Sequence, residues 1–296
     1  MRGVDGDVPK TKRGVDGDVP TGVRGADASV GFRRAGPRGH DDRMTPAPAP
    51  SRAHSFNAAA ARYAAYRPSY PPALFDAVER LAGRSLTGAR VADVGAGTGI
   101  ATALLVDRGA DVVAVEPGQG MAEQFRRTLP HTPLVRGDGN ALPLADACAD
   151  FLTYAQAWHW TDQERSVPEA LRVLRPGGAL ALWWNIPDPD TSWFDAQTAR
   201  VARFLGMDDD TRRAADRTSE LTTALDFRRD RVHWSRSVPL DTHLANLGTH
   251  SAFLVLGEER SAAFLAEERA ELLKVFPDAV VEERYFVDLL VAIRPA

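Results

Sequence analysis

Apolar positions between residues 90 and 184 gather into five short runs, separated by stretches whose apolar residues recur with helical spacing. The runs read RVADVGA, DVVAVEP, TPLVRGD, ADFLTYAQA and GALALWW, at residues 90–96, 111–117, 132–138, 149–157 and 178–184. The intervening helices are expected near residues 100–108, 119–128 and 162–174. Nearly continuous apolar strands that alternate with helices are typical of a parallel sheet covered on both faces, with right-handed crossovers.

The chain on either side of this alternation is expected to add helices and two more strands. A helical pattern begins at Phe56 and is interrupted near Pro68, because proline breaks a helix interior. After Asn185, helices are expected over 192–205, 241–249 and 258–276, and strands over 231–239 and 284–294. Because no Gly/Pro-rich linker interrupts this stretch, residues 55–296 are predicted to form one domain, in which the helices between 190 and 275 form a cap or one flank of a pocket.

The first 54 residues have a different composition. RGVDGDVP occurs at residues 2–9 and again at 13–20, and residues 1–50 contain no Leu or Ile and one aromatic residue, Phe32. Such a segment cannot bury enough apolar surface to offset the entropy lost on ordering, so residues 1–54 are expected to be disordered. We expect Met44 to be the natural start, and the alternative is that the segment serves as an interaction tail.

Composition excludes several classes of protein. The net charge of −4 provides no general basic field for nucleic acid, and no apolar run approaches the ~18 residues that cross a membrane. The single cysteine, Cys148, excludes an internal disulfide and a cysteine-based zinc site, and fits a cytoplasmic protein. No third ligand accompanies His243 and His250, so no metal site is expected.

A glycine-rich loop, VADVGAGTG, follows the first strand and precedes a helix. Glycines permit a tight turn and let the backbone approach a ligand closely, and the helix start at Thr98 offers free N–H groups. The dinucleotide fingerprint G-x-G-x-x-G/A would need Gly or Ala at position 100, which is Ile100. The spacing is instead D-x-G-x-G-x-G, formed by Asp93, Gly95, Gly97 and Gly99.

This loop resembles motif I of the class I S-adenosylmethionine-dependent methyltransferases. Glu116 at the end of the next strand, RGDGNALPL at 136–144 and LRVLRPGGAL at 171–180 extend the resemblance. YAAYRPSYP at 63–71 and AQAWHW at 155–160 are similar to the type 11 methyltransferases related to trans-aconitate methyltransferase. The resemblance is good over residues 55–186 and weak over 187–280. It implies an α/β, Rossmann-like, doubly wound fold: a mostly parallel seven-stranded sheet with an antiparallel last strand and a small helical cap.

The resemblance also implies how S-adenosylmethionine is bound. Glu116 would accept the ribose hydroxyls, and Asp138 would reach the adenine amino group. Arg67 would pair with the methionyl carboxylate, unless it is a surface arginine. The cofactor-binding residues expected on this basis are Asp93, Gly95, Gly97, Thr98, Gly99, Glu116, Pro117, Asp138, Gly139, Asn140, Ala141, Gln156, Arg67 and Tyr66.

The segment AQAWHW is expected to carry the chemistry, since ligands of open α/β sheets bind outside the carboxyl ends of the strands. His159 is the candidate for a base or for a group that orients the acceptor, and the alternative is a histidine that only packs or lines the cofactor. An aromatic face can attract the cationic sulfonium, although aromatic residues also form core. The residues expected in the substrate pocket are Trp158, Trp160, Trp184 and His250.

These features predict an enzyme that transfers a methyl group to a small-molecule acceptor. A carboxylate, a hydroxyl and an amine all stay open as the methylated group, and so do a precursor in specialised metabolism and a small organic acid. Two other interpretations stay open: a non-catalytic S-adenosylmethionine-binding regulator and a nucleotide-cofactor oxidoreductase. Ile100 counts against the oxidoreductase.

Overall fold

The computed structural model describes residues 60–188, 190–207 and 225–296. The expectations for the repeats of residues 1–54 and for Met44 lie outside the described residues.

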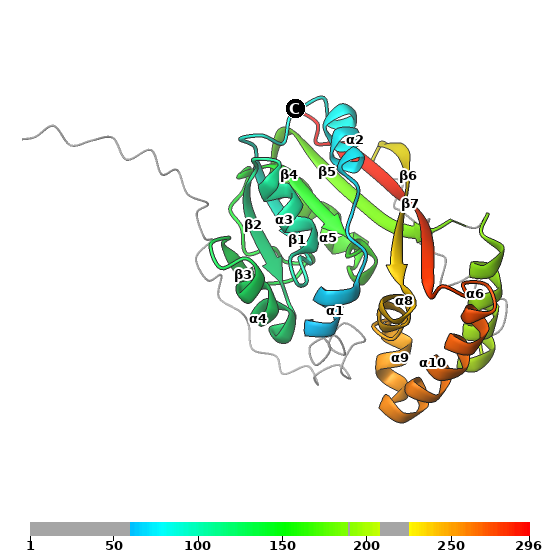
Figure 1. Ribbon diagram of the computed structural model, residues 1–296. Coiled ribbons are helices and arrows are strands. Elements are labelled where there is room, and N and C mark those ends of the chain that lie inside the picture. The colour runs from blue at the N-terminus through cyan, green and yellow to red at the C-terminus, as the bar shows by residue number, and fades with distance from the viewer. Residues whose placement is uncertain (1–59, 189, 208–224) are drawn as a thin grey trace, which may run out of the picture. The chain divides into compact units, whose positions relative to one another are not determined.

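Seven strands of the described residues form one sheet, in the order β3-β2-β1-β4-β5-β7-β6 (Figure 1). The first five strands pair in parallel, and β7 pairs antiparallel with β5 on one side and with β6 on the other. This arrangement confirms the expected α/β fold and its antiparallel last strand. The strands are β1 (Arg90–Val94), β2 (Asp111–Glu116), β3 (Leu134–Arg136), β4 (Ala149–Ala155), β5 (Leu174–Pro187), β6 (Phe227–Pro239) and β7 (Val280–Ile293).

Helices cover both faces of this sheet, because successive strand residues point to opposite faces. One apolar cluster joins Val91, Trp183 and Leu289 to helices α2 and α3, and another joins Leu152 and Trp184 to α5. The neighbouring residues Trp183 and Trp184 therefore lie on opposite faces of β5. The helices of this part are α1 (Ala60–Tyr66), α2 (Pro72–Ala82), α3 (Ile100–Asp107), α4 (Gln119–Thr128) and α5 (Gln163–Val173).

Four further helices of the described residues gather at one end of β6 and β7, as Figure 1 shows. They are α6 (Ser192–Leu205), α8 (Leu240–Leu247), α9 (Ser251–Leu256) and α10 (Glu258–Leu273). Helix α1 contacts both α4 and α8, so it connects the glycine-loop half of the molecule with this group of helices, which we call the cap. The sequence pattern predicted the cap and its helices over 192–205, 241–249 and 258–276, but it gave no helix at α9.

A buried polar network holds the cap to the sheet. Glu268, whose side chain is fully buried, binds the Arg200 guanidinium through two hydrogen bonds of 2.6 Å. Gln197 connects Glu268 to His243, and His243 Nδ1 lies 2.6 Å from Glu283 of β7. Buried charges are tolerated when each has a partner, so this network fixes how α6, α8 and α10 meet β7.

No helix in the described part of the chain combines the length and apolar character that crossing a bilayer requires.

Candidate functional site

The glycine loop after β1 lies at the carboxyl edge of the sheet. Gly95, Gly97 and Gly99 have φ values of 68°, 58° and 94°, which side-chain-bearing residues rarely adopt. The N–H groups of Gly95 and Ala96 both donate to the Val115 carbonyl of β2, at 2.8 and 3.1 Å. These bonds anchor the loop to the neighbouring strand, and α3 begins directly after it at Ile100.

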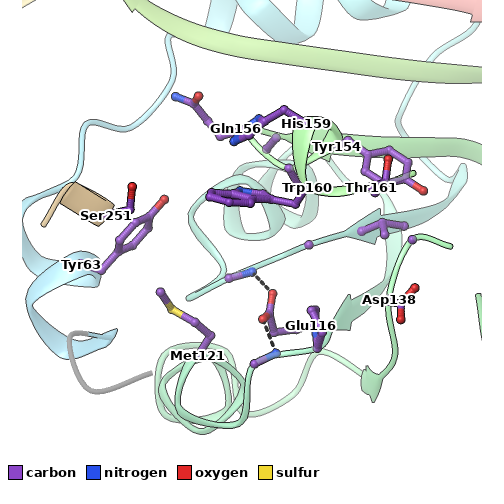
Figure 2. Close-up of a pocket in the computed structure, with 18 of the residues that line it drawn as sticks. Tyr63, Glu116, Met121, Asp138, Tyr154, Gln156, His159, Trp160, Thr161 and Ser251 are labelled. Atoms are coloured by element: carbon purple, nitrogen blue, oxygen red, sulfur yellow. Dashed lines mark hydrogen bonds between the residues drawn. The ribbon is translucent and has the colours of Figure 1, made fainter. Parts of the chain in front are cut away.

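Glu116 ends β2 and turns its carboxylate to this loop. Oε2 accepts the Gly97 N–H at 2.8 Å, and Oε1 accepts the Gly118 N–H at 2.6 Å (Figure 2). Burial raises the pKa of Glu116, and the two N–H groups oppose that rise. A carboxylate offers about four lone-pair sites, so two remain for hydroxyl donors in the adjoining pocket.

Asp93 lies beneath the loop and does not line the pocket. Its fully buried carboxylate accepts hydrogen bonds from the hydroxyls of Thr102, at 2.6 Å, and Thr153, at 2.8 Å. Burial raises the pKa of Asp93 to about 6. The structure therefore gives this residue a place under the loop, where it ties β1 to α3 and β4.

The segment after β3 forms one end of the pocket. Asp138 Oδ1 accepts the Asn140 N–H at 2.7 Å, and Asn140 Oδ1 accepts the Asp162 N–H at 2.8 Å. A Cβ on Gly139 would lie 2.8 Å from Thr161 Cγ2 and 3.1 Å from the Tyr154 hydroxyl, so only glycine fits there. Asp138 consequently faces the pocket from a closely packed turn.

The segment after β4 forms the middle of the pocket. Gln156 has a φ of 57°, an uncommon value for a residue with a side chain, and its N–H is held by the Trp183 carbonyl at 2.9 Å. A short 3₁₀ helix, Trp158–Trp160, follows. His159 and Trp160 line the pocket, and burial lowers the pKa of His159.

Two of the tryptophans expected in the pocket lie elsewhere. Trp158 packs in the core edge-on against Tyr154, with ring centroids 4.7 Å apart. Trp184 is 3% exposed on the sheet face that α5 covers, and it reaches the site only through its indole N–H, which donates to His159 Nδ1 at 3.2 Å. The prediction that these two residues line the substrate pocket is therefore wrong. The 3₁₀ turn directs Trp158 into the core, and the alternation of strand residues directs Trp184 there.

Helix α1 and the cap form the other end of the pocket. Figure 2 shows Tyr63 and Ser251 on the side opposite Asp138 and Thr161. The Arg67 guanidinium stacks over the Tyr63 ring at 4.8 Å and donates to the Thr249 carbonyl at 3.3 Å, while its buried Nε has no hydrogen-bond partner. His250 is accessible from the pocket, yet burial, with a smaller contribution from Arg67, lowers its pKa to about 3.

These segments enclose one pocket of about 640 Å³. Most of the residues predicted from the sequence line it: Gly95, Gly97, Glu116, Pro117, Asp138, Gly139, Asn140, Gln156, Arg67, His159, Trp160 and His250. Other predicted residues lie outside the lining: Asp93, Thr98, Gly99, Ala141, Tyr66, Trp158 and Trp184. The prediction missed several residues that line the pocket, among them Met121, Tyr154, Thr161 and Ser251. Thr161 directly follows AQAWHW, and Met121 lies in the helix that begins after Glu116, so their positions next to predicted residues were the available signal.

A methyltransferase-domain family, type 11, matches residues 92–182. An uncharacterized methyltransferase of Mycobacterium tuberculosis is 41% identical over 181 residues, which cover 61% of this chain and 70% of the relative. A malonyl-[acyl-carrier protein] O-methyltransferase of Methylococcus capsulatus is 41% identical over 99 residues, which cover 31% of this chain and 36% of the relative.

A solved structure from Anaeromyxobacter dehalogenans, assigned as a type II methyltransferase, has a similar fold. It is 26% identical with a TM-score of 0.58, and the match covers 77% of this chain and 97% of that one. The similarity thus extends beyond residues 92–182 to most of the described chain.

Proposed function

The chain belongs to the class I S-adenosylmethionine-dependent methyltransferases, and on that premise we propose that it transfers the methyl group of S-adenosylmethionine to a small-molecule acceptor bound in this pocket. The observation that carries the proposal is the meeting of the glycine loop, Glu116 and the segment after β4 around one cavity. These three parts supply a nucleoside site and an acceptor site next to each other.

The residues present fit the cofactor. Glu116 keeps lone pairs for the two ribose hydroxyls after it has accepted the N–H groups of Gly97 and Gly118. Asp138 and Asn140 lie where the adenine would follow, beyond the end of β3. At the opposite end, the Nε of Arg67 is buried without a partner, and a carboxylate is the group that an arginine binds most strongly. We therefore assign Arg67 to the methionyl carboxylate.

The protein acts mainly through positioning. The bound cofactor supplies a methyl group that its sulfonium makes electrophilic. Holding an acceptor in line with that methyl group provides much of the rate of such a displacement. Gln156, His159 and Trp160 line the pocket between its nucleoside end and the cap, and the partly exposed Trp160 indole offers an aromatic face to a cation.

The volume of the pocket supports a small acceptor. Sites for small molecules and cofactors span roughly 300–1,000 Å³. The pocket measures about 640 Å³, so it would leave limited space for an acceptor beside the cofactor. We propose that the methylated group is a carboxylate, a hydroxyl or an amine. Names of relatives, such as the malonyl-[acyl-carrier protein] O-methyltransferase, support methylation of an oxygen.

A transfer assay tests the proposal. The full chain is incubated with S-adenosylmethionine that carries a labelled methyl group and with panels of carboxylic acids, phenols and amines, and products are detected by the label and by the mass of one added methyl group. We expect transfer by the wild type and its loss in Glu116→Ala. If the wild type binds the cofactor but transfers no label to any panel, the enzymatic role is contradicted and a binding protein remains.

A further inference from the structure

The indole of Trp184 determines which nitrogen of His159 is available to the pocket. Trp184 Nε1 lies 3.2 Å from His159 Nδ1, and an indole nitrogen can only donate a hydrogen bond. His159 Nδ1 must therefore accept, and it needs a free lone pair to do so. Trp184 is 3% exposed on the α5 face of the sheet, so the donor is held in place by core packing.

The charge of the imidazole settles the position of its proton. The ordinary pKa of histidine, about 6.5, already lies below 7 and burial lowers the pKa of His159 further, so the neutral ring predominates at pH 7. A neutral imidazole carries one proton, and when Nδ1 accepts a hydrogen bond that proton is on Nε2. A doubly protonated ring would direct an N–H of His159 against the N–H of Trp184, which is an additional obstacle to protonation.

The His159 ring lines the pocket and is exposed to it. Its Nδ1 edge is occupied by Trp184, so the opposite edge, with Nε2, is the one left for a ligand. The structure shows no hydrogen bond from Nε2 to the described residues. His159 therefore offers the pocket one N–H donor and no lone pair.

We infer that His159 donates a hydrogen bond through Nε2–H to the bound acceptor and does not remove a proton from it, and that Trp184 is the positioning residue that fixes this tautomer. The inference rests on the proposed function because it takes this pocket as the acceptor's site. It decides between the two roles that the sequence left open for His159.

A consequence for the acceptor follows. In the transfer, the bond between the methyl carbon and sulfur breaks with its electron pair left on sulfur, and a lone pair of the acceptor forms the new bond. A general base at His159 would need a lone pair on Nε2, where the tautomer has a proton. The site therefore selects an acceptor that presents a lone pair to Nε2–H and has no proton to give to this imidazole. An acceptor that arrives as an anion leaves as a neutral product and releases no proton.

The tautomer can be measured directly. The full chain is labelled with ¹⁵N-histidine, and long-range ¹H–¹⁵N correlation spectra distinguish Nε2–H, Nδ1–H and doubly protonated rings. The chain has seven histidines, and the signals of His159 are those missing from the spectrum of His159→Gln. We expect the Nε2–H tautomer for His159 at pH 7. An Nδ1–H tautomer or a doubly protonated ring in the wild type would overturn the inference.

Variants of the two neighbouring tryptophans test the part played by Trp184. Trp184→Phe and Trp184→Leu remove the donor and should give a mixture of both tautomers. Trp183→Phe removes an equally buried indole from the opposite face of β5 and should leave His159 in the Nε2–H form. If a folded Trp184 variant keeps the pure Nε2–H tautomer, Trp184 does not position the ring. Should both Trp184 variants fail to fold, the wild-type spectrum still decides the donor role.

This test is independent of the proposed function, because it needs neither acceptor nor turnover. Absence of cofactor binding would contradict the proposed function and leave the tautomer result intact. Once an acceptor is identified, His159→Gln, which retains an N–H donor, should lose less kcat/KM than His159→Ala, for which we expect a loss of about 10- to 100-fold. Equal losses in the two variants would indicate a base.

Discussion

A Cβ placed on Gly95 would lie 2.5 Å from the Cβ of Ala157. The glycine loop after β1 and the segment after β4 thus meet with no space for a side chain between them. This close approach brings together the parts of the pocket that we propose for the nucleoside and for the acceptor. The relationship makes glycine at position 95 a requirement of packing as well as of backbone conformation.

Gly95→Ala is therefore expected to impair both stability and cofactor binding. Its φ of 68° is unfavourable for alanine, and the added methyl group overlaps Ala157, so we expect a loss of about 3 kcal/mol in the free energy of unfolding. Gly83→Ala is the matched control, since φ is 63° and nothing lies within 4 Å of its Cβ. It should cost about 1 kcal/mol. Equal losses in urea denaturation would contradict the packing argument.

Asp93 should make the free energy of unfolding fall as pH rises, which is opposite to the usual effect of a carboxyl group in a folded protein. Burial raises its pKa from 3.8 to about 6, so the folded state holds the proton more tightly than the unfolded chain does. As pH rises from 4 to 7, the unfolded chain releases this proton first, and the free energy of unfolding falls. The shift corresponds to about 3 kcal/mol. Asp93→Asn cannot ionise, so its stability should lack this fall.

The measurement is urea denaturation of the wild type and Asp93→Asn at a series of pH values. We expect the wild type to lose stability relative to the variant between pH 4 and pH 7. A difference between the two proteins that stays constant over this range would show that the Asp93 carboxyl is not held protonated by burial.

The buried Glu268–Arg200 pair should be essential for the cap. Glu268→Gln removes the carboxylate that accepts both hydrogen bonds of the Arg200 guanidinium, at a position where the side chain is fully buried, and we expect a loss of about 3 kcal/mol. Glu282→Gln on β7 is the control, because the Glu282–Arg284 pair is exposed to solvent. It should leave Tm unchanged within error in differential scanning calorimetry. A Tm for Glu268→Gln as high as that of the control would contradict this account.

Arg67 should contribute to affinity only through the amino-acid part of the cofactor. Arg67→Met is expected to weaken binding of S-adenosylhomocysteine about 10-fold or more, since a charge-assisted hydrogen bond is lost. 5′-Methylthioadenosine lacks the carboxylate, so its affinity should be unchanged. Calorimetric titration of both ligands into wild type and variant measures the difference. Equal weakening of both would mean that Arg67 acts on the fold of α1 instead.

The sequence predicts those parts of the site that depend on local backbone chemistry. Glycines between a strand and a helix indicate a ligand loop, and a carboxylate at the end of the next strand indicates a ribose site. Gly97 and Glu116 duly meet in the structure, because parallel strands bring their carboxyl ends to one edge. The mostly parallel seven-stranded sheet and its antiparallel last strand came from the resemblance and are confirmed, whereas the strand order is a finding of the structure.

Other parts could not be predicted because they depend on the direction of single side chains. Trp183 and Trp184 are adjacent in the chain, and only the pairing of β5 in the sheet decides which of them faces α5. Asp93 belongs to the sequence motif, yet the hydroxyls that hold it, on Thr102 and Thr153, come from separate elements. Likewise, Ser251 reaches the pocket through the tertiary placement of the cap, where the sequence resemblance is weak.

The most direct test of the account is calorimetric titration of the full chain with S-adenosylmethionine and S-adenosylhomocysteine, alongside Glu116→Ala and Glu123→Ala. Glu123 is an exposed carboxylate on α4 outside the pocket lining, so it serves as the control. We predict micromolar binding by the wild type and Glu123→Ala, and an affinity weakened about 30-fold or more in Glu116→Ala. A folded wild-type chain that binds neither ligand, or a Glu116→Ala variant that binds as well as the control, would contradict the assignment of this pocket to the cofactor.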